Sequence, residues 1–120
     1  MSSGREIPPS VQQQIVRLQQ LQQSLGVLLA EKQRVETELA EINNALEELN
    51  KSDDNIVVFK AVGPVLVQTT KDKMLAELNE RRELADTRLK VLERQEARTR
   101  SQLDTLQKEV QRALSGQTPT

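Results

Sequence analysis

Two long stretches of the chain repeat apolar residues at the spacing of a helix with a single apolar seam. With Val11 as heptad position a, positions a and d over residues 10–50 are almost all apolar. With Leu75 as position a, the same holds over residues 71–115. This 3.5-residue repeat predicts two coiled-coil helices. The polar interruptions are Gln14, Lys32, Arg82, Glu96 and Thr99.

Short polar motifs suggest where the two helices begin and end. Ser10 with Gln13 has the spacing of a capping box, and so does Thr69 with Asp72. Gly116 follows the second seam and suits a helix C-terminus. The ends of the chain, residues 1–9 and 116–120, are predicted to be flexible tails.

The segment between the helices, residues 55–70, has a different pattern, rich in β-branched residues. We predict two strands, residues 56–62 and 65–70, joined by a type II′ turn at Gly63-Pro64. Both faces of this hairpin are largely apolar, and an isolated hairpin is marginal in water. The hairpin is therefore expected to be covered by hairpins of other subunits, in an oligomeric β-barrel body. A hydrophobic loop folded back on the helix ends is the alternative.

The residues expected to form that oligomeric contact are the apolar side chains of the two strands and the turn between them. They are Ile56, Val57, Val58, Phe59, Val62, Gly63, Pro64, Val65, Leu66 and Val67. Because the two helices are of near-equal length and flank a short insert, the fold class is mainly α. It is a long antiparallel two-helix coiled coil with one central β-hairpin. Each arm would be about 60 Å long, with both termini at the end far from the hairpin.

Composition removes most kinds of active site. The 120 residues carry 17 Lys and Arg against 18 Asp and Glu, a net charge of −1, and no His or Cys. There is thus no imidazole base, thiol nucleophile, disulfide or Cys/His zinc site. No phosphate-binding Gly-Lys loop and no apolar span long enough for a bilayer occur. We expect no enzyme, no cofactor and no metal, no membrane partner, and a cytoplasmic location.

The central placement of one hairpin, with the sequence Val62-Gly63-Pro64-Val65-Leu66-Val67 between two long helices, resembles the β-class subunit of prefoldin. The likeness extends from about Val11 to Leu114. The α-class subunits carry two hairpins and need a longer middle segment. The compact tails are more similar to archaeal members than to eukaryotic ones.

The resemblance implies an ATP-independent chaperone of the cytosol, in which two α and four β subunits join through their hairpins. Unfolded polypeptides would be held at the coiled-coil tips and passed to a group II chaperonin. The family's tip positions map to eight apolar residues near the two termini: Val11, Ile15, Leu18, Leu21, Leu103, Leu106, Val110 and Leu114. At the open ends of the two-helix coil, we expect residues such as Val11, Ile15, Val110 and Leu114 to stay accessible to clients.

Two other classes of function remain open. The first is a structural or adaptor coiled coil that joins a prefoldin-like assembly without binding clients. The second is nucleic-acid binding through arginines of the second helix, but acidic neighbours largely neutralise that stretch and favour a solvated face. The arginines are Arg94, Arg98, Arg100 and Arg112.

Overall fold

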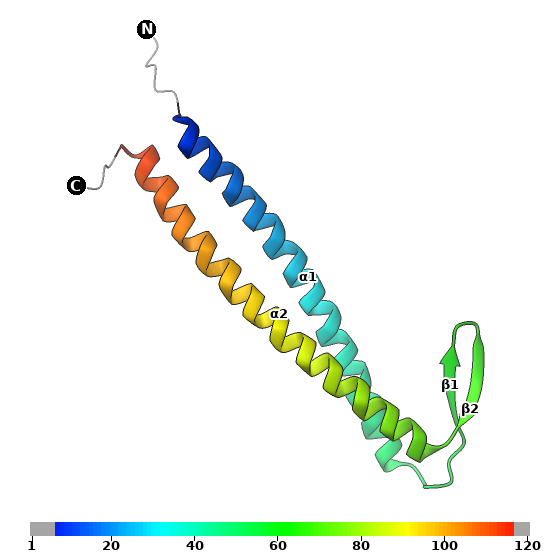
Figure 1. Cartoon of the computed structure of the whole chain (residues 1–120). Helices are drawn as coiled ribbons and strands as arrows, with labels where there is room; N and C mark the ends of the chain where they lie inside the picture. Colours follow the sequence, from blue (N-terminus) through cyan, green and yellow to red (C-terminus); the bar gives the residue numbers. More distant parts are fainter. Residues whose placement is uncertain (1–6, 117–120) are drawn as a thin grey trace. The chain divides into compact units, whose positions relative to one another are not determined.

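The computed structural model describes residues 7–116 and contains two helices and two strands. Helix α1 (Pro9–Lys51) is followed by strands β1 (Val58–Val62) and β2 (Val65–Thr69) and by helix α2 (Lys71–Leu114) (Figure 1). The chain forms two compact units. We call residues 32–91 the hairpin unit, and residues 7–31 with 92–116 the terminal unit. The predicted fold class, two long helices with one antiparallel hairpin, is confirmed.

Helix α1 begins one residue before the expected start. The Pro8 carbonyl accepts hydrogen bonds from the amides of Val11 and Gln12, at 2.9 and 3.0 Å. Pro9 is therefore the first helical residue, where the missing N–H of proline costs nothing. Ser10 lies inside the first turn and is not the cap, contrary to the sequence prediction.

Helix α2 is capped by Thr70 rather than by Thr69. The Thr70 hydroxyl accepts a hydrogen bond from the Lys73 amide at 3.2 Å, and its carbonyl accepts one from the Met74 amide at 3.0 Å. At the other end, the Gly116 amide donates to the Ala113 carbonyl at 3.4 Å. Gly116 has a φ of 76°, a left-handed value that favours glycine after a helix.

Burial follows the predicted heptads closely. Every predicted a and d residue of α1 is buried or half-buried, and in α2 only Arg82 and Ala113 are exposed. The 3.5-residue reading of both seams is thereby confirmed. In the hairpin unit one cluster of buried apolar residues consists of Ile42, Leu46 and Leu78. The side chains packed against it are Ala45, Leu49, Met74 and Leu75.

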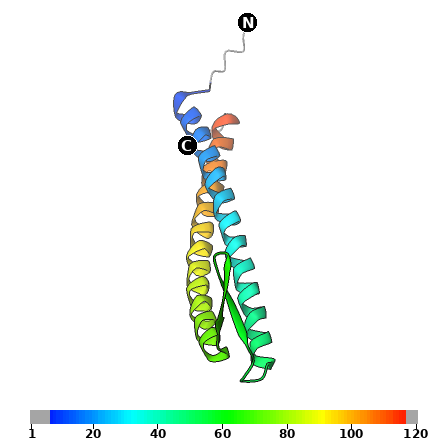
Figure 2. The same ribbon diagram turned by 90° about the vertical axis from the view of Figure 1, so that its right-hand side faces the viewer.

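The hairpin is a regular two-stranded antiparallel sheet. Its register pairs Val58 with Thr69 and Val62 with Val65, so Gly63 and Pro64 form a two-residue turn. Gly63 has a φ of 57°, the sign that a type II′ turn requires at its first central position. Figure 1 and Figure 2, two views 90° apart, show the two strands joined at one end to the ends of α1 and α2.

Candidate assembly and client-binding surfaces

The two faces of the hairpin have different environments. The face with Val58, Lys60 and Thr69 is half-buried at those positions. The opposite face is exposed along its length, and Phe59 and Leu66 keep 57% and 71% of their surface. We call this second face, formed by Phe59, Ala61, Leu66 and Gln68, the free face of the hairpin.

An ion pair holds the other face against α2. The Lys60 ammonium lies 2.7 Å from a carboxylate oxygen of Glu77, and both side chains are 38% exposed. Because Lys60 points toward α2, its strand neighbours Phe59 and Ala61 must point away from it. The pair thus explains why Phe59 and Ala61 face away from α2, although Val62, Val65 and Val67 near the turn are exposed on the Lys60 face as well.

The predicted assembly residues are mostly exposed in the single chain. Within the hairpin and its approach, only Val58 of the ten is half-buried. Exposed apolar side chains gathered on one small hairpin are typical of a surface that a partner covers. Their role in oligomerisation stays a prediction.

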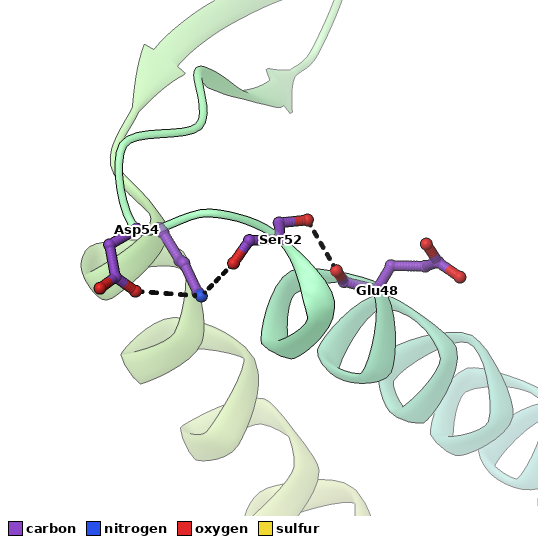
Figure 3. Close-up of polar contacts among 4 residues, drawn as sticks. Glu48, Ser52 and Asp54 are labelled. Atoms are coloured by element: carbon purple, nitrogen blue, oxygen red, sulfur yellow. Dashed lines mark hydrogen bonds and ion pairs between the residues drawn. The ribbon is translucent and has the colours of Figure 1, made fainter.

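The connection between α1 and the hairpin is held by a buried cation. Lys71, the first residue of α2, is only 8% exposed. Its ammonium donates to the Ser52 carbonyl oxygen at 2.7 Å and lies 3.3 Å from a carboxylate oxygen of Asp54 (Figure 3). Ser52 is itself anchored, because its hydroxyl donates to the Glu48 carbonyl at 2.8 Å. Sequence reasoning missed this contact, since nothing in the periodicity identifies a lysine that caps another helix.

The eight predicted tip residues divide into three groups by burial. Leu114 is exposed, at 52% of its surface. Ile15, Leu18 and Leu106 are half-buried. The four buried residues are Val11, Leu21, Leu103 and Val110. The expectation that Val11 and Val110 stay accessible is therefore wrong for the closed seam, because each lies at a core heptad position.

Shallow grooves run beside the seam in the terminal unit. One groove, of about 320 Å³, is lined by Leu21 and Leu106 together with polar residues such as Arg17 and Thr105. Another, of about 300 Å³, is lined by Leu25 and Leu103 with a similarly polar rim. Buried and half-buried seam residues thus line open grooves, where an apolar side chain of another polypeptide could touch them.

The first half of α1 also carries apolar residues outside the seam, which the heptad reading did not identify. Val16, Val27 and Leu29 are 52%, 67% and 37% exposed. Between Pro9 and Ala30 the only charged residue is Arg17. The sequence could have revealed these exposed residues, because Val16 and Val27 occupy heptad positions f and c, where a coiled coil usually has polar residues.

The structure of residues 7–116 gives little support for metal binding, membrane insertion or nucleic-acid binding. No cluster of three or more acidic residues that could hold a metal ion occurs in this part of the chain. No helix among the same residues is long and apolar enough to cross a bilayer. In α2, Arg100 pairs with Glu96 at 2.9 Å and Lys108 with Asp104 at 3.0 Å. These local pairs favour the solvated-face interpretation of the arginine-rich stretch.

Comparisons with known proteins agree with this architecture. The family model described as "Prefoldin subunit" matches residues 12–117. The chain is 43% identical over 110 residues to prefoldin subunit beta of Thermococcus kodakarensis, covering 92% of this chain and 94% of that protein. It is 42% identical over 112 residues to prefoldin subunit beta of Archaeoglobus fulgidus, covering 93% and 97%.

Solved structures give the same result. The crystal structure of the prefoldin beta subunit from Thermococcus strain KS-1 superposes with a TM-score of 0.83 at 40% identity, covering 97% of this chain and 99% of that one. The prefoldin beta2 subunit of the same strain, at 21% identity and a TM-score of 0.70, shares the fold and covers 76% of this chain and 97% of that one. The chain therefore belongs to the prefoldin subunit family, and its similarity to archaeal beta subunits extends over nearly its whole length.

Proposed function

We propose that this chain is a β-class subunit of an ATP-independent holding chaperone. It captures unfolded polypeptides at its coiled-coil tips in the cytoplasm and passes them to a group II chaperonin. The observation that carries the proposal is the near full-length match to prefoldin beta subunits. Family membership supports a chaperone-type function, and the details below rest on the surfaces of this chain.

The free face of the hairpin supports assembly with other subunits. A two-stranded sheet with exposed Phe59 and Leu66 has two open edges and an uncovered apolar face. Hairpins of an α-class subunit and of further copies would remove both from water. We propose a complex of two α and four β subunits.

The terminal unit supports client binding. Its α1 segment offers exposed Val16, Val27 and Leu29 in a stretch with one charged residue, and its grooves are lined in part by Leu21 and Leu106. Apolar contact of this kind suits unfolded chains, whose sequences vary but whose apolar side chains are exposed. Each surface is small, so several tips acting on one client would supply avidity.

Trimming the tips tests the proposal. Removing residues 1–31 and 92–120 takes away the whole terminal unit and no residue of the hairpin unit. We expect the trimmed hexamer to form normally and to lose suppression of client aggregation. Native mass spectrometry reports the assembly, and light scattering of a denatured protein reports the holding activity. Full protection by the trimmed hexamer would contradict tip binding.

The same assay separates the chaperone from a structural or adaptor subunit of a prefoldin-like complex. An adaptor would assemble with an α-class subunit and give no protection in any trimmed or intact form. A chaperone should protect in 1 M salt about as well as in low salt, because apolar contact is not screened as charge pairs are.

A further inference from the structure

We propose that Lys71 is a positioning residue for assembly. We call the two connections between the helices and the hairpin, residues 52–57 and Thr70, the neck. The buried ammonium of Lys71 holds the neck closed and thereby fixes the direction in which the hairpin presents its free face. The inference rests on the proposed assembly through the hairpin. It assigns a function in assembly to a residue outside the predicted contact surface.

The location of Lys71 is unusual for a lysine. It is the first residue of α2, where the partial positive charge of the helix N-terminus disfavours a cation. It is also 8% exposed, although lysine is rarely buried without partners. A burial that is unfavourable on both counts requires a compensating contact.

That contact is with the end of α1. The Lys71 ammonium donates to the Ser52 carbonyl at 2.7 Å, directly after the last residue of α1. A helix C-terminus carries partial negative charge on its unpaired carbonyls, so a cation is favourable there. One ammonium thus joins the end of α1 to the start of α2 and draws together residues that are 19 apart in sequence.

Asp54 is a minor partner of the same ammonium. Its carboxylate lies at 3.3 Å, but its side chain is 97% exposed and screened by water. Ser52 is rigidly held, because its amide donates to the Leu49 carbonyl at 3.1 Å and its hydroxyl to Glu48. The geometry therefore identifies the carbonyl contact, rather than the ion pair, as the closure of the neck (Figure 3).

Closure of the neck limits the freedom of the hairpin. Residues 52–57 and Thr70 are its two connections to the helices. The longer connection contains a turn in which the Ile56 amide donates to the Asp53 carbonyl at 3.1 Å. With both connections held at Lys71, Lys60 can meet Glu77 and the free face points away from α2. Without Lys71, the same hairpin could form but would adopt many orientations, and assembly would carry the cost of ordering it.

The test measures orientation and assembly separately. The chain has no cysteine, so Gln68→Cys and Lys90→Cys introduce the only two sites for spin labels, on β2 and α2. In labelled chain diluted with unlabelled chain, we expect a narrow distance distribution that Lys71→Met broadens. Assembly with an α-class subunit should need about tenfold more Lys71→Met protein, as expected for losing a hydrogen bond from a charged group.

Two control variants define the effect. Lys73→Met removes an exposed lysine two residues away and should change neither readout. Asp54→Asn should have only a small effect on both, whereas an effect as large as that of Lys71→Met would overturn the carbonyl assignment. An unchanged distance distribution and unchanged assembly in Lys71→Met would overturn the proposal altogether.

One outcome distinguishes this inference from the proposed function. If Lys71→Met broadens the distribution but assembles normally while Phe59→Asp fails to assemble, the hairpin is the interface, and the inference fails because assembly does not depend on the orientation that Lys71 fixes. If Phe59→Asp also assembles normally, the proposed interface itself is wrong. Acylation of the unmodified protein needs no variant: Lys71 should react about tenfold more slowly than Lys73, and equal rates would refute its buried contact.

Discussion

Lys60 in β1 and Glu77 in α2 are joined by an ion pair of 2.7 Å that fixes which face of the hairpin lies toward α2. Side chains alternate along a strand, so fixing Lys60 toward the helix places Phe59 on the opposite side. The same alternation, continued through the register, places Leu66 beside Ala61 on that exposed side.

Charge on the exposed side should prevent assembly. We expect Phe59→Asp or Leu66→Asp to abolish the hexamer while circular dichroism stays close to that of the unmodified protein. A carboxylate without a partner is strongly disfavoured in an apolar interface, whereas the seam of the helices is untouched. Native mass spectrometry measures the outcome. Gln95→Asp, at an exposed position of α2, is the control that should still assemble.

The Lys60–Glu77 pair should contribute modestly to stability. A double-mutant cycle with Lys60→Met and Glu77→Gln is expected to give a coupling energy of up to about 1 kcal/mol, since both groups are more than one-third exposed. Thermal unfolding in low and in 1 M salt measures it. A coupling energy that does not fall in high salt would show that the side chains interact by packing rather than by charge.

Two glycines should respond in opposite directions to alanine. Gly26 lies within α1, and an added Cβ would meet nothing within 4 Å, so Gly26→Ala should raise the free energy of unfolding by about 1 kcal/mol. Gly63 has a φ of 57°, and Gly63→Ala should lower the free energy by about 1 kcal/mol through backbone strain. Chemical denaturation of both variants tests the pair. A destabilised Gly26→Ala protein would indicate that the glycine allows a bend that α1 needs.

The outward valines of α1 should take part in client holding. Val27→Gln, together with Val16→Gln, is expected to lower aggregation suppression several-fold without changing assembly, because multivalent binding amplifies a small loss at each tip. Leu84→Gln is a matched control, since Leu84 is 66% exposed in the hairpin unit and Val27 is 67% exposed in the terminal unit. Equal loss in the control would point to client contacts along the whole helices.

Holding should need neither nucleotide nor metal. The sequence contains no Gly-rich loop with the lysine that cradles phosphates, so apyrase or a chelator should leave aggregation suppression unchanged. Loss of protection after either treatment, with the hexamer intact by native mass spectrometry, would count against the proposed mechanism.

The sequence predicted the two helices and their buried seam residues correctly, but it did not predict the side-chain contacts that join one element to another. Heptads gave the seam residues because burial in a coiled coil follows position alone. The caps were misplaced by two residues at Ser10 and by one at Thr69, since serine, threonine and proline follow one another there and several could serve. The contacts of Lys60 and Lys71 span 17 and 19 residues, and no local pattern specifies them.

Sequence separation along the seam also bears on how the seam opens. Lys71 and Ser52 are 19 residues apart, whereas Gln14 and Glu109, joined at 3.4 Å in the terminal unit, are 95 apart. Closing a longer loop costs more chain entropy. Contacts between the two helices should therefore form first near the neck and last near the termini during folding. The terminal pairs are then the first to fray. Transient fraying would expose the buried side chains of Val11 and Val110. A seam that is closed on average could therefore still bind an unfolded polypeptide through these residues.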